Sequence, residues 1–417
     1  MSDHAPALPT HRTERMSGRN PHESHRVATP LELLFDLTFV IAFGIAASHL
    51  AHSVAEGHLG AGLTGFAFAM FAVCWAWINF SWFASAFDTD DWLYRLTTMV
   101  QMAGVLVLSL GLPQMFKSIE EGAHVDNGVM VLGYVIMRVA MVFQWARAAR
   151  QNPDRRAACM TYITAVLIAQ VGWVAVIIID MPLLPTFVCV VLLTLVEMTG
   201  PYIAERRYGG TPWHAHHIAE RYSLLAIIAL GEGVVGTVAS ISAIVDEQGW
   251  SFEAVAIALA GTGLTFAMWW LYFVIPSAQV LHAQRKRSFV WGYGHIFVFA
   301  AIAATGAGLH VAAYFMEHEA HIGEAAAVAA VAVPVGLYIA MVFALYIYLL
   351  GKIERLYIIL LTASAFTLAL SVSAAAAGFD VALCLLIVVA APAIPVIGYE
   401  MKGHAYGSRA LKKRLAS

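Results

Sequence analysis

The feature that most constrains the fold is a succession of twelve apolar runs, each close to the roughly 20 residues that a helix needs to cross a membrane. Only 12% of the residues are charged and 60% are hydrophobic, against roughly 25% and 45–50% in soluble domains. This excludes an ordinary cytosolic enzyme or a nucleic-acid-binding protein. We predict an all-α integral membrane protein with about twelve transmembrane helices, over residues 31–50, 60–83, 94–116, 128–149, 157–179, 182–203, 218–243, 251–275, 288–314, 322–350, 354–377 and 381–400.

Little of the chain lies outside these runs. Residues 1–28 are rich in His and Arg and lack the apolar centre of a secretory signal peptide, so we expect a disordered cytoplasmic tail. Residues 402–417 form a second, basic cytoplasmic tail. With loops of about ten residues, no room remains for a soluble domain of ordinary size. Any chemistry therefore takes place within or between the helices.

The basic residues predict the orientation, because cytoplasmic loops keep an excess of Lys and Arg. With an N-terminus inside and twelve spans, all but two of the 24 basic residues fall in the two tails and the even-numbered loops. The exceptions are Lys117, in an outside loop, and Arg138, within a run. We expect a multi-pass protein of the bacterial plasma (inner) membrane with both termini in the cytoplasm.

The two halves of the chain share local patterns. Thr64-Gly65-x-x-Phe68-Ala69-Met70 in the second run returns as Thr262-Gly263-x-x-Phe266-Ala267-Met268 in the eighth, each followed by tryptophans. The first and seventh runs both open with a glutamate after a basic stretch. These matches predict two six-helix repeats over residues 29–204 and 211–401, with the same orientation because six is an even number.

The first run starts with a capping pattern, Thr29-Pro30-x-Glu32, which satisfies free N–H groups at a helix start. Asp36 lies one turn deeper on the same face, and the cap does not explain it. An acid at this depth costs at least about 2.5–3.5 kcal/mol unless it is paired or hydrated. Arg95 and Arg138 are the expected partners, in either a structural ion pair or a permeation path.

Two more positions place charge inside runs. Arg138 lies near the middle of the fourth run and Glu197 lies in the sixth. Both are expected to face protein, either as an ion pair between helices or as part of a path for protons or solute. At the start of the third run, Asp88, Asp90 and Asp91 are expected to be a solvated helix start, and a divalent cation there is the weaker interpretation.

The seventh run is the most distinctive. Arg221 and Glu232 are eleven residues apart, which places them on one face of a helix and about 16 Å apart along its axis. Glu232 is then near the middle of the bilayer. The flanking Gly231, Gly233 and Gly236 permit close helix packing or local unwinding, as at the binding sites of transporters. A protonated Glu232 that only packs between helices is the alternative.

Histidines add titratable groups around these runs. One group resembles a metal cluster and consists of His214, His216 and His217 with Glu220. The sequence has no second ligand set with zinc spacing, so we favour a solvated segment. His295 in the ninth run could join a proton path or only bond a neighbour. The four cysteines have no metal spacing, and no Walker, dinucleotide or HExxH motif occurs. We therefore predict no cofactor and no metal.

Several motifs together resemble one family. The motifs are Glu32-Leu33-Leu34-Phe35-Asp36, Asp88-x-Asp90-Asp91 with Arg95 and Gln101, Glu220-Arg221 with Leu230-Gly231-Glu232, and Trp269-Trp270. In this combination the chain is similar to the bacterial low-temperature requirement A family over residues 25 to 400. The family is named for an association with growth in the cold, and the resemblance implies no defined activity. Gly233 stands where a serine is common and Leu34 where a phenylalanine is common.

Together these observations favour movement of a small solute or ion across the membrane, proton-linked, with a role in growth at low temperature and no enzyme activity. The expected partners are the lipid bilayer and the solute or ion, with no nucleic acid, and assembly with further copies stays open. The alternatives are a membrane-embedded enzyme or lipid-handling protein that adjusts the bilayer, and a structural membrane protein. The expected pathway residues are Glu32, Asp36, Arg95, Arg138, Glu197, Glu220, Arg221, Glu232 and His295, with no catalytic residue assigned.

Overall fold

A computed structural model describes residues 13–21, 23 and 26–403. Twelve helices of this part are long and apolar enough to cross a membrane, which confirms the predicted class. A short helix, α9, lies between α8 and α10. The helices are α1 (Pro30–Ala55), α2 (Leu59–Phe87), α3 (Trp92–Glu121), α4 (Gly128–Gln151), α5 (Arg156–Ile179), α6 (Leu183–Arg207), α7 (Ala215–Gln248), α8 (Phe252–Val274), α9 (Ser277–Ala283), α10 (Ser288–Met316), α11 (Glu324–Leu350), α12 (Arg355–Ala376) and α13 (Val381–Gly398).

Local signals set several helix ends. The predicted capping box is present at α1, where Thr29 Oγ1 accepts from the Glu32 backbone N–H and the Glu32 carboxylate accepts from the Thr29 N–H. Asp91 caps α3 in the same way through the Tyr94 N–H. Gly122 and Gly351 end α3 and α11 with φ of 78° and 67°, a conformation that favours glycine. The chain therefore encodes these ends locally.

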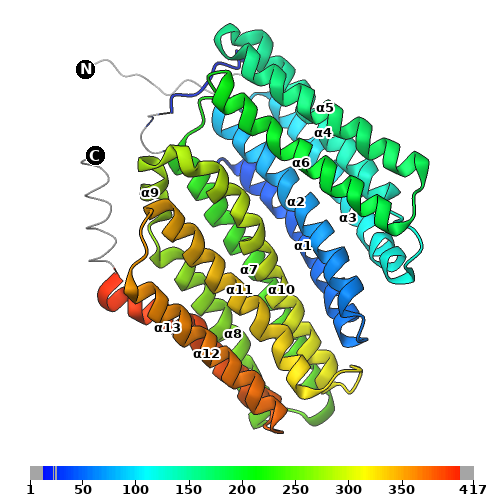
Figure 1. Cartoon of the computed structure of the whole chain (residues 1–417), viewed down its shortest axis with the longest axis vertical. Coiled ribbons are helices and arrows are strands. Elements are labelled where there is room, and N and C mark those ends of the chain that lie inside the picture. Colours follow the sequence, from blue (N-terminus) through cyan, green and yellow to red (C-terminus); the bar gives the residue numbers. More distant parts are fainter. Residues whose placement is uncertain (1–12, 22, 24–25, 404–417) are drawn as a thin grey trace.

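The helices form two groups in chain order, and Figure 1 shows them side by side along a tilted bundle. In the first group α1 packs on α2 and α3, and α3 to α6 then pack each on the next. In the second group α7 packs on α8 and α10, and each of α10 to α12 packs on the next helix of the chain. Helix α13 also packs on α8. The proposed six-helix repeat stays a prediction.

Helices α1 and α2 meet α7 and α10 between the two groups. Asp36 of α1 contacts Arg221 of α7, and further along both helices Gly44 of α1 lies beside Glu232. The two helices therefore run in the same direction. This agrees with their places as the first and seventh spans, since all odd-numbered spans cross the membrane in the same direction. This central interface brings together charged residues that are far apart in the sequence.

The outer faces of the bundle are apolar. Large side chains on α5 and α6 stand far out of the protein, and Ile178 and Leu184 are 77% and 76% exposed. In water such a surface would be unfavourable, whereas lipid tails are its natural solvent. The described helices thus present their apolar faces to the bilayer and keep most charged side chains at the helix ends or between helices.

Three connections gather at one end of the bundle. Residues 13–21, part of the tail predicted to be disordered, lie across the end of α4: the Gly18 N–H donates to Asn152 Oδ1 at 3.0 Å, and Met16 is fully buried. Arg285, from the turn before α10, reaches the Trp213 carbonyl between α6 and α7. Three of the even-numbered loops predicted to be cytoplasmic are thus neighbours. Residues 404–417 of the predicted basic tail, and Arg12, lie outside the described residues.

Candidate functional site

The central interface holds a buried charge cluster, which consists of Glu32 and Asp36 of α1 with His217 and Arg221 of α7. All four side chains are fully buried. Arg221 Nη1 lies 2.9 Å from Glu32 Oε1, and Arg221 Nη2 donates to Asp36 Oδ1. His217 Nε2 lies 3.2 Å from Glu32 Oε2. One guanidinium therefore bridges two carboxylates across the boundary between the two groups of helices.

Trp77 of α2 completes the cluster, since its indole Nε1 donates to Asp36 Oδ1 at 2.6 Å. The other carboxylate oxygen of Asp36, Oδ2, is buried without a hydrogen-bond partner, and so is His217 Nδ1. Two carboxylates face one guanidinium, so the cluster carries a net negative charge unless a proton occupies His217 or a carboxyl group. A buried uncompensated charge is costly, which favours a cluster that holds one proton.

The predicted partners of Asp36 were wrong. Arg95 instead pairs with Asp90 at 2.7 Å on the surface, where its side chain is 48% exposed. Arg138 lies in α4, away from α1, and pairs with Glu197. Arg95 and Arg138 both lie in the first six spanning helices. Helix α1 packs against α7, which belongs to the second group, and Arg221 of α7 is the cation that pairs with Asp36. The need for a partner was correct, and the packing supplied a different one.

Arg138 and Glu197 form a second buried pair, between α4 and α6, at 3.0 Å. This is the ion pair between helices that the sequence offered as one interpretation. Glu197 Oε1 also accepts from Trp173 Nε1 at 2.9 Å, and Glu197 Oε2 accepts from the Tyr134 hydroxyl at 2.5 Å. The carboxylate is therefore fully engaged. This arrangement holds three helices together and leaves little capacity for a mobile proton.

Glu232 lies on the same face of α7 as Arg221, as its spacing predicted, and contacts α1 and α10. Its carboxyl group lies against Gly44, where an added Cβ would stand 3.1 Å from Glu232 Oε1. Gly306 of α10 packs so closely that a Cβ there would come within 2.8 Å of the Glu232 backbone. Glu232 is 6% exposed. Within the described part of the chain, its carboxylate makes no hydrogen bond or ion pair.

The glycines around Glu232 act by close approach and not by unwinding, because α7 is a continuous helix through this region. A Cβ on Gly233 would meet Thr265 Oγ1 of α8 at 2.7 Å, and one on Gly236 would meet the Gly306 carbonyl at 2.7 Å. Gly231 has open space at the same position. Thus Gly233 and Gly236 bring α8 and α10 against α7, while Gly231 does not.

The remaining predicted pathway residues lie elsewhere. His295 of α10 is buried, its Nε2 bonds the Tyr272 hydroxyl at 3.0 Å and its Nδ1 bonds the Trp291 carbonyl at 2.8 Å. Both ring nitrogens are therefore engaged in a packed aromatic environment. Glu220 is half-buried near the start of α7. Among the described residues, no group of three or more His, Cys, Asp or Glu is arranged to hold a metal ion.

The acidic segment before α3 is less solvated than the sequence suggested. Asp88 and Asp91 are both buried, while Asp90 is exposed. Burial, together with the nearby Glu32 carboxylate, raises the pKa of Asp88 to about 6. Burial alone would also raise the pKa of Asp91, but hydrogen bonds from the Arg147 guanidinium and the Tyr94 N–H outweigh it and lower that pKa. The segment is thus part helix cap and part ion pair.

His217 and Trp77 are the cluster residues that the sequence did not identify as one site with Asp36. The sequence suggests only a metal-ligand role for His217, and it places Trp77 only among the tryptophans that follow the repeated motif of the second run. One signal was available, because His217 lies four residues before Arg221 and so shares its helix face. No such signal joined Trp77 to Asp36, since their contact depends on how α1 and α2 pack.

Comparisons with known proteins agree with the motifs. The sequence model of the bacterial low temperature requirement A protein (LtrA) matches residues 27–391. An uncharacterized protein of Rhizobium meliloti (strain 1021) is 28% identical over 298 residues, which cover 66% of this chain and 67% of that protein. No solved structure matches the chain. With a match over nearly all of its membrane-spanning part, this multi-pass membrane protein belongs to the bacterial low temperature requirement A family.

Proposed function

We propose that this protein moves a small solute or ion across the bacterial plasma membrane, coupled to protons, and that this movement supports growth at low temperature. We also propose that both termini lie in the cytoplasm, because the basic residues are concentrated in the tails and the even-numbered loops. The observation that carries the proposal is Glu232, a carboxyl group without a partner, enclosed between α1, α7 and α10 at the middle of a membrane-spanning helix. Intramembrane acids are costly and are retained mainly where they bind ions or protons.

The charge cluster supports a proton-linked mechanism. Glu32 and Asp36 compete for Arg221, and Asp36 keeps one buried oxygen without a partner. A proton that moves between this cluster and the outside changes the net charge of the interface between the two helix groups. Glu232 lies further along the same face of α7, so the two sites can act on one path through the protein.

The position of both sites between the two groups of helices also supports transport. In transporters built of two halves, substrate sites lie near the midplane between the halves, and rocking of one half on the other exposes the site to each side in turn. Here α1 and α2 of one group face α7 and α10 of the other across this boundary. The boundary holds the buried charge cluster and the carboxyl group of Glu232.

The test uses the purified full-length protein in liposomes with a pH-sensitive dye inside. Under an imposed pH gradient and membrane potential, the wild-type protein is expected to carry protons, alone or with added mono- and divalent ions. Glu232→Gln keeps the shape of the side chain but cannot titrate, so it should abolish this flux. Glu121→Gln, an exposed carboxyl at the end of α3, serves as the matched control and should leave the flux unchanged.

Growth gives a second readout. In a strain that lacks the gene, the wild-type protein and Glu121→Gln should restore growth in the cold, whereas Glu232→Gln should not, at equal amounts in the membrane. A Glu232→Gln protein with normal flux and unchanged pH dependence would leave Glu232 as a packing residue. Absence of any flux through the wild-type protein, with growth still restored, would remove transport as the function.

A further inference from the structure

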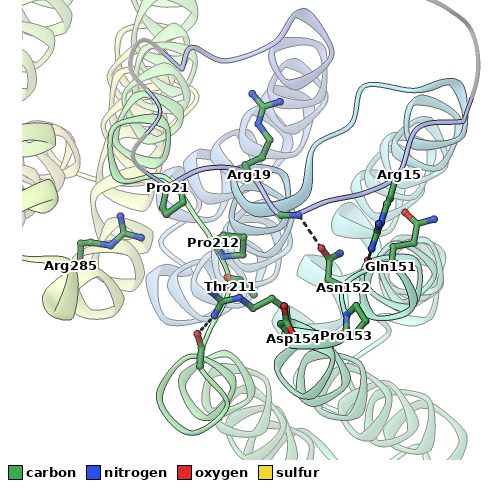
Figure 2. Close-up of a pocket in the computed structure, with 13 residues that line it drawn as sticks. Arg15, Arg19, Pro21, Gln151, Asn152, Pro153, Asp154, Thr211, Pro212 and Arg285 are labelled. Carbon is green, nitrogen blue, oxygen red and sulfur yellow. Dashed lines mark hydrogen bonds between the residues drawn. The ribbon is translucent and has the colours of Figure 1, made fainter.

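A cavity of about 670 Å³ lies at the end of the bundle where the even-numbered loops meet. Its walls come from the described tail residues, the α4–α5 connection, the α6–α7 loop and the turn before α10. In Figure 2, Arg285 stands on one side of it, and Arg15, Gln151 and Asn152 stand on the opposite side. The volume is in the range of roughly 300–1,000 Å³ that is usual for ligand pockets.

The lining is strongly basic. Four arginines contribute to it, Arg15, Arg19, Arg155 and Arg285, while Asp154 is the one acidic residue of the lining. Arg19 also pairs with Glu23, at 3.4 Å and partly in solvent. Like charges gathered around one space repel each other unless an anion or counterions neutralise them. The cavity therefore favours an anionic ligand.

Contacts with the backbone hold three of these arginines in place, and Arg15 Nη2 donates to the Gln151 carbonyl at 3.1 Å. Arg155 Nη1 donates to the Gly209 and Gly210 carbonyls, and Arg285 Nη2 donates to the Trp213 carbonyl at 2.7 Å. The Arg285 guanidinium also stacks over the Trp213 ring, 4.0 Å from its centre. A guanidinium fixed in this way presents its remaining N–H groups in a defined direction, at a smaller entropic cost on binding.

Two donors in the lining have no acceptor. Arg285 Nη1 and Arg19 Nε are both buried without a hydrogen-bond partner. Both atoms are shielded from solvent, so a ligand in the cavity would contact them only after the side chains rotate, and that contact would recover the cost of the missing acceptors. Thr211 and Asn152 add polar side chains to the wall, although Thr211 Oγ1 donates to Glu205 and Asn152 Oδ1 accepts from Gly18. The side chains that lack hydrogen-bond acceptors are thus arginines, which favour a ligand with several acceptor oxygens.

We propose that this cavity binds a phosphate-bearing anion, with Arg155 and Arg285 on the helix side and Arg15 and Arg19 on the tail side. Guanidinium groups bind phosphate oxygens in a bidentate manner, which fits a lining with several arginines and few other cations. The cavity lies where helices end, at the depth of lipid headgroups, so the phosphate can belong to an anionic lipid or to a soluble compound. The proposal does not depend on transport through Glu232.

Binding is tested with the purified full-length protein in two arms. In neutral detergent, pyrophosphate is titrated by calorimetry as the soluble probe. In nanodiscs of phosphatidylcholine with phosphatidylglycerol, native mass spectrometry after gentle release measures which lipid stays bound. Saturable pyrophosphate binding identifies a soluble phosphate compound as the ligand class. Selective retention of phosphatidylglycerol without pyrophosphate binding identifies a lipid headgroup.

The variants assign the binding to the cavity. Arg155→Gln with Arg285→Gln should weaken binding of whichever probe binds at least about tenfold, since two guanidinium groups that form charge-assisted hydrogen bonds to the anion are lost. Arg206→Gln with Arg207→Gln removes the same charge from the exposed end of α6, outside the lining, and should change binding less than about twofold.

A second pair, Arg15→Gln with Arg19→Gln, changes only the tail and keeps the test valid if the first pair fails to fold. It should also weaken binding, by about tenfold on the same estimate. The proposal is overturned if the wild-type protein binds neither probe selectively. It is also overturned if the lining variants and the Arg206/Arg207 control bind equally well, because the attraction would then come from general surface charge.

Discussion

At the scale of single residues, burial decides which charges matter. Arg221 is fully buried and contacts two carboxylates, so its removal affects the protein core. Arg95 has an equally short contact to Asp90, but both side chains are in solvent. Exposed pairs contribute little to stability, whereas breaking one side of a buried pair leaves a charge that the core cannot hold. Distance alone would rank these two arginines as equals.

We expect Arg221→Leu to lower the free energy of unfolding in detergent by about 3–5 kcal/mol, because it leaves Glu32 and Asp36 without a cation. Asp36→Asn should cost less, since Arg221 still pairs with Glu32. The double variant should recover part of the loss. Arg95→Leu is the control and should cost less than about 1 kcal/mol. Equal, small losses for Arg221→Leu and Arg95→Leu in thermal or denaturant unfolding would contradict a buried charge cluster.

Asp88 gives a prediction for pH. Its pKa is about 6 in the folded protein because burial and the Glu32 carboxylate disfavour its charged form. The folded state therefore binds this proton more tightly than the unfolded state, and stability falls as pH rises from about 4 to about 6. Above that range the full cost, on the order of 3 kcal/mol, is present.

Asp88→Asn removes this titration and keeps an oxygen for the Asp90 N–H. The variant should therefore be more stable than wild type at pH 7.5, and the difference should shrink as pH falls towards 4. Unfolding measured at several pH values in one detergent tests this. A difference that is constant with pH, or that grows as pH falls, would show that Asp88 is not held in an environment that opposes its charge.

At the scale of elements, α7 organises the centre of the molecule. It carries Arg221 and Glu232 on one face towards α1, and Gly233 and Gly236 where α8 and α10 come close. Small residues permit such approach in membranes, where packing and not the hydrophobic effect holds helices together. The helix stays regular throughout. The position of Glu232 is thus fixed by neighbouring backbones and not by a bond to its carboxyl group.

Gly306→Ala tests this packing, because its Cβ would come within 2.8 Å of the backbone of Glu232. Such overpacking typically costs about 1–3 kcal/mol, and it should also disturb any flux that depends on Glu232. Gly231→Ala adds the same methyl group to open space and should be neutral or slightly stabilising, by up to about 1 kcal/mol. Thermal unfolding of the two variants side by side gives the comparison. Equal effects would mean that α7 and α10 pack more loosely than described.

At the scale of the whole molecule, two groups of six spanning helices meet along α1, α2, α7 and α10. The tail, the α4–α5 connection and the α6–α7 loop gather at one end, with the arginines that line the basic cavity. At the other end of the bundle, the last turns of α3 carry Lys117 and Glu120. This division is what an inside excess of basic residues predicts for twelve spans.

Topology can be tested with single introduced cysteines and a maleimide that does not cross membranes. Arg150→Cys and Lys286→Cys should react only from the cytoplasmic side, and Glu120→Cys only from outside, because an odd number of spans separates Glu120 from the other two. The native cysteines lie within helices, and a variant without introduced cysteines gives the background. Reaction of any of the three from the opposite side would refute the proposed orientation.

The number of spans, their approximate positions, the α1 cap and the family can all be predicted from the amino-acid sequence. A bilayer requires an apolar run of fixed length for each crossing, and a cap needs only residues within one turn, so both are readable locally. The sequence also indicates that Asp36 needs a partner. Helix packing, in contrast, makes Arg221 the partner of Asp36, 185 residues away, and places Gly44 and Gly306 against Glu232. Helix faces are all apolar towards lipid, so their pattern does not specify which helices become neighbours, and packing has to supply that information.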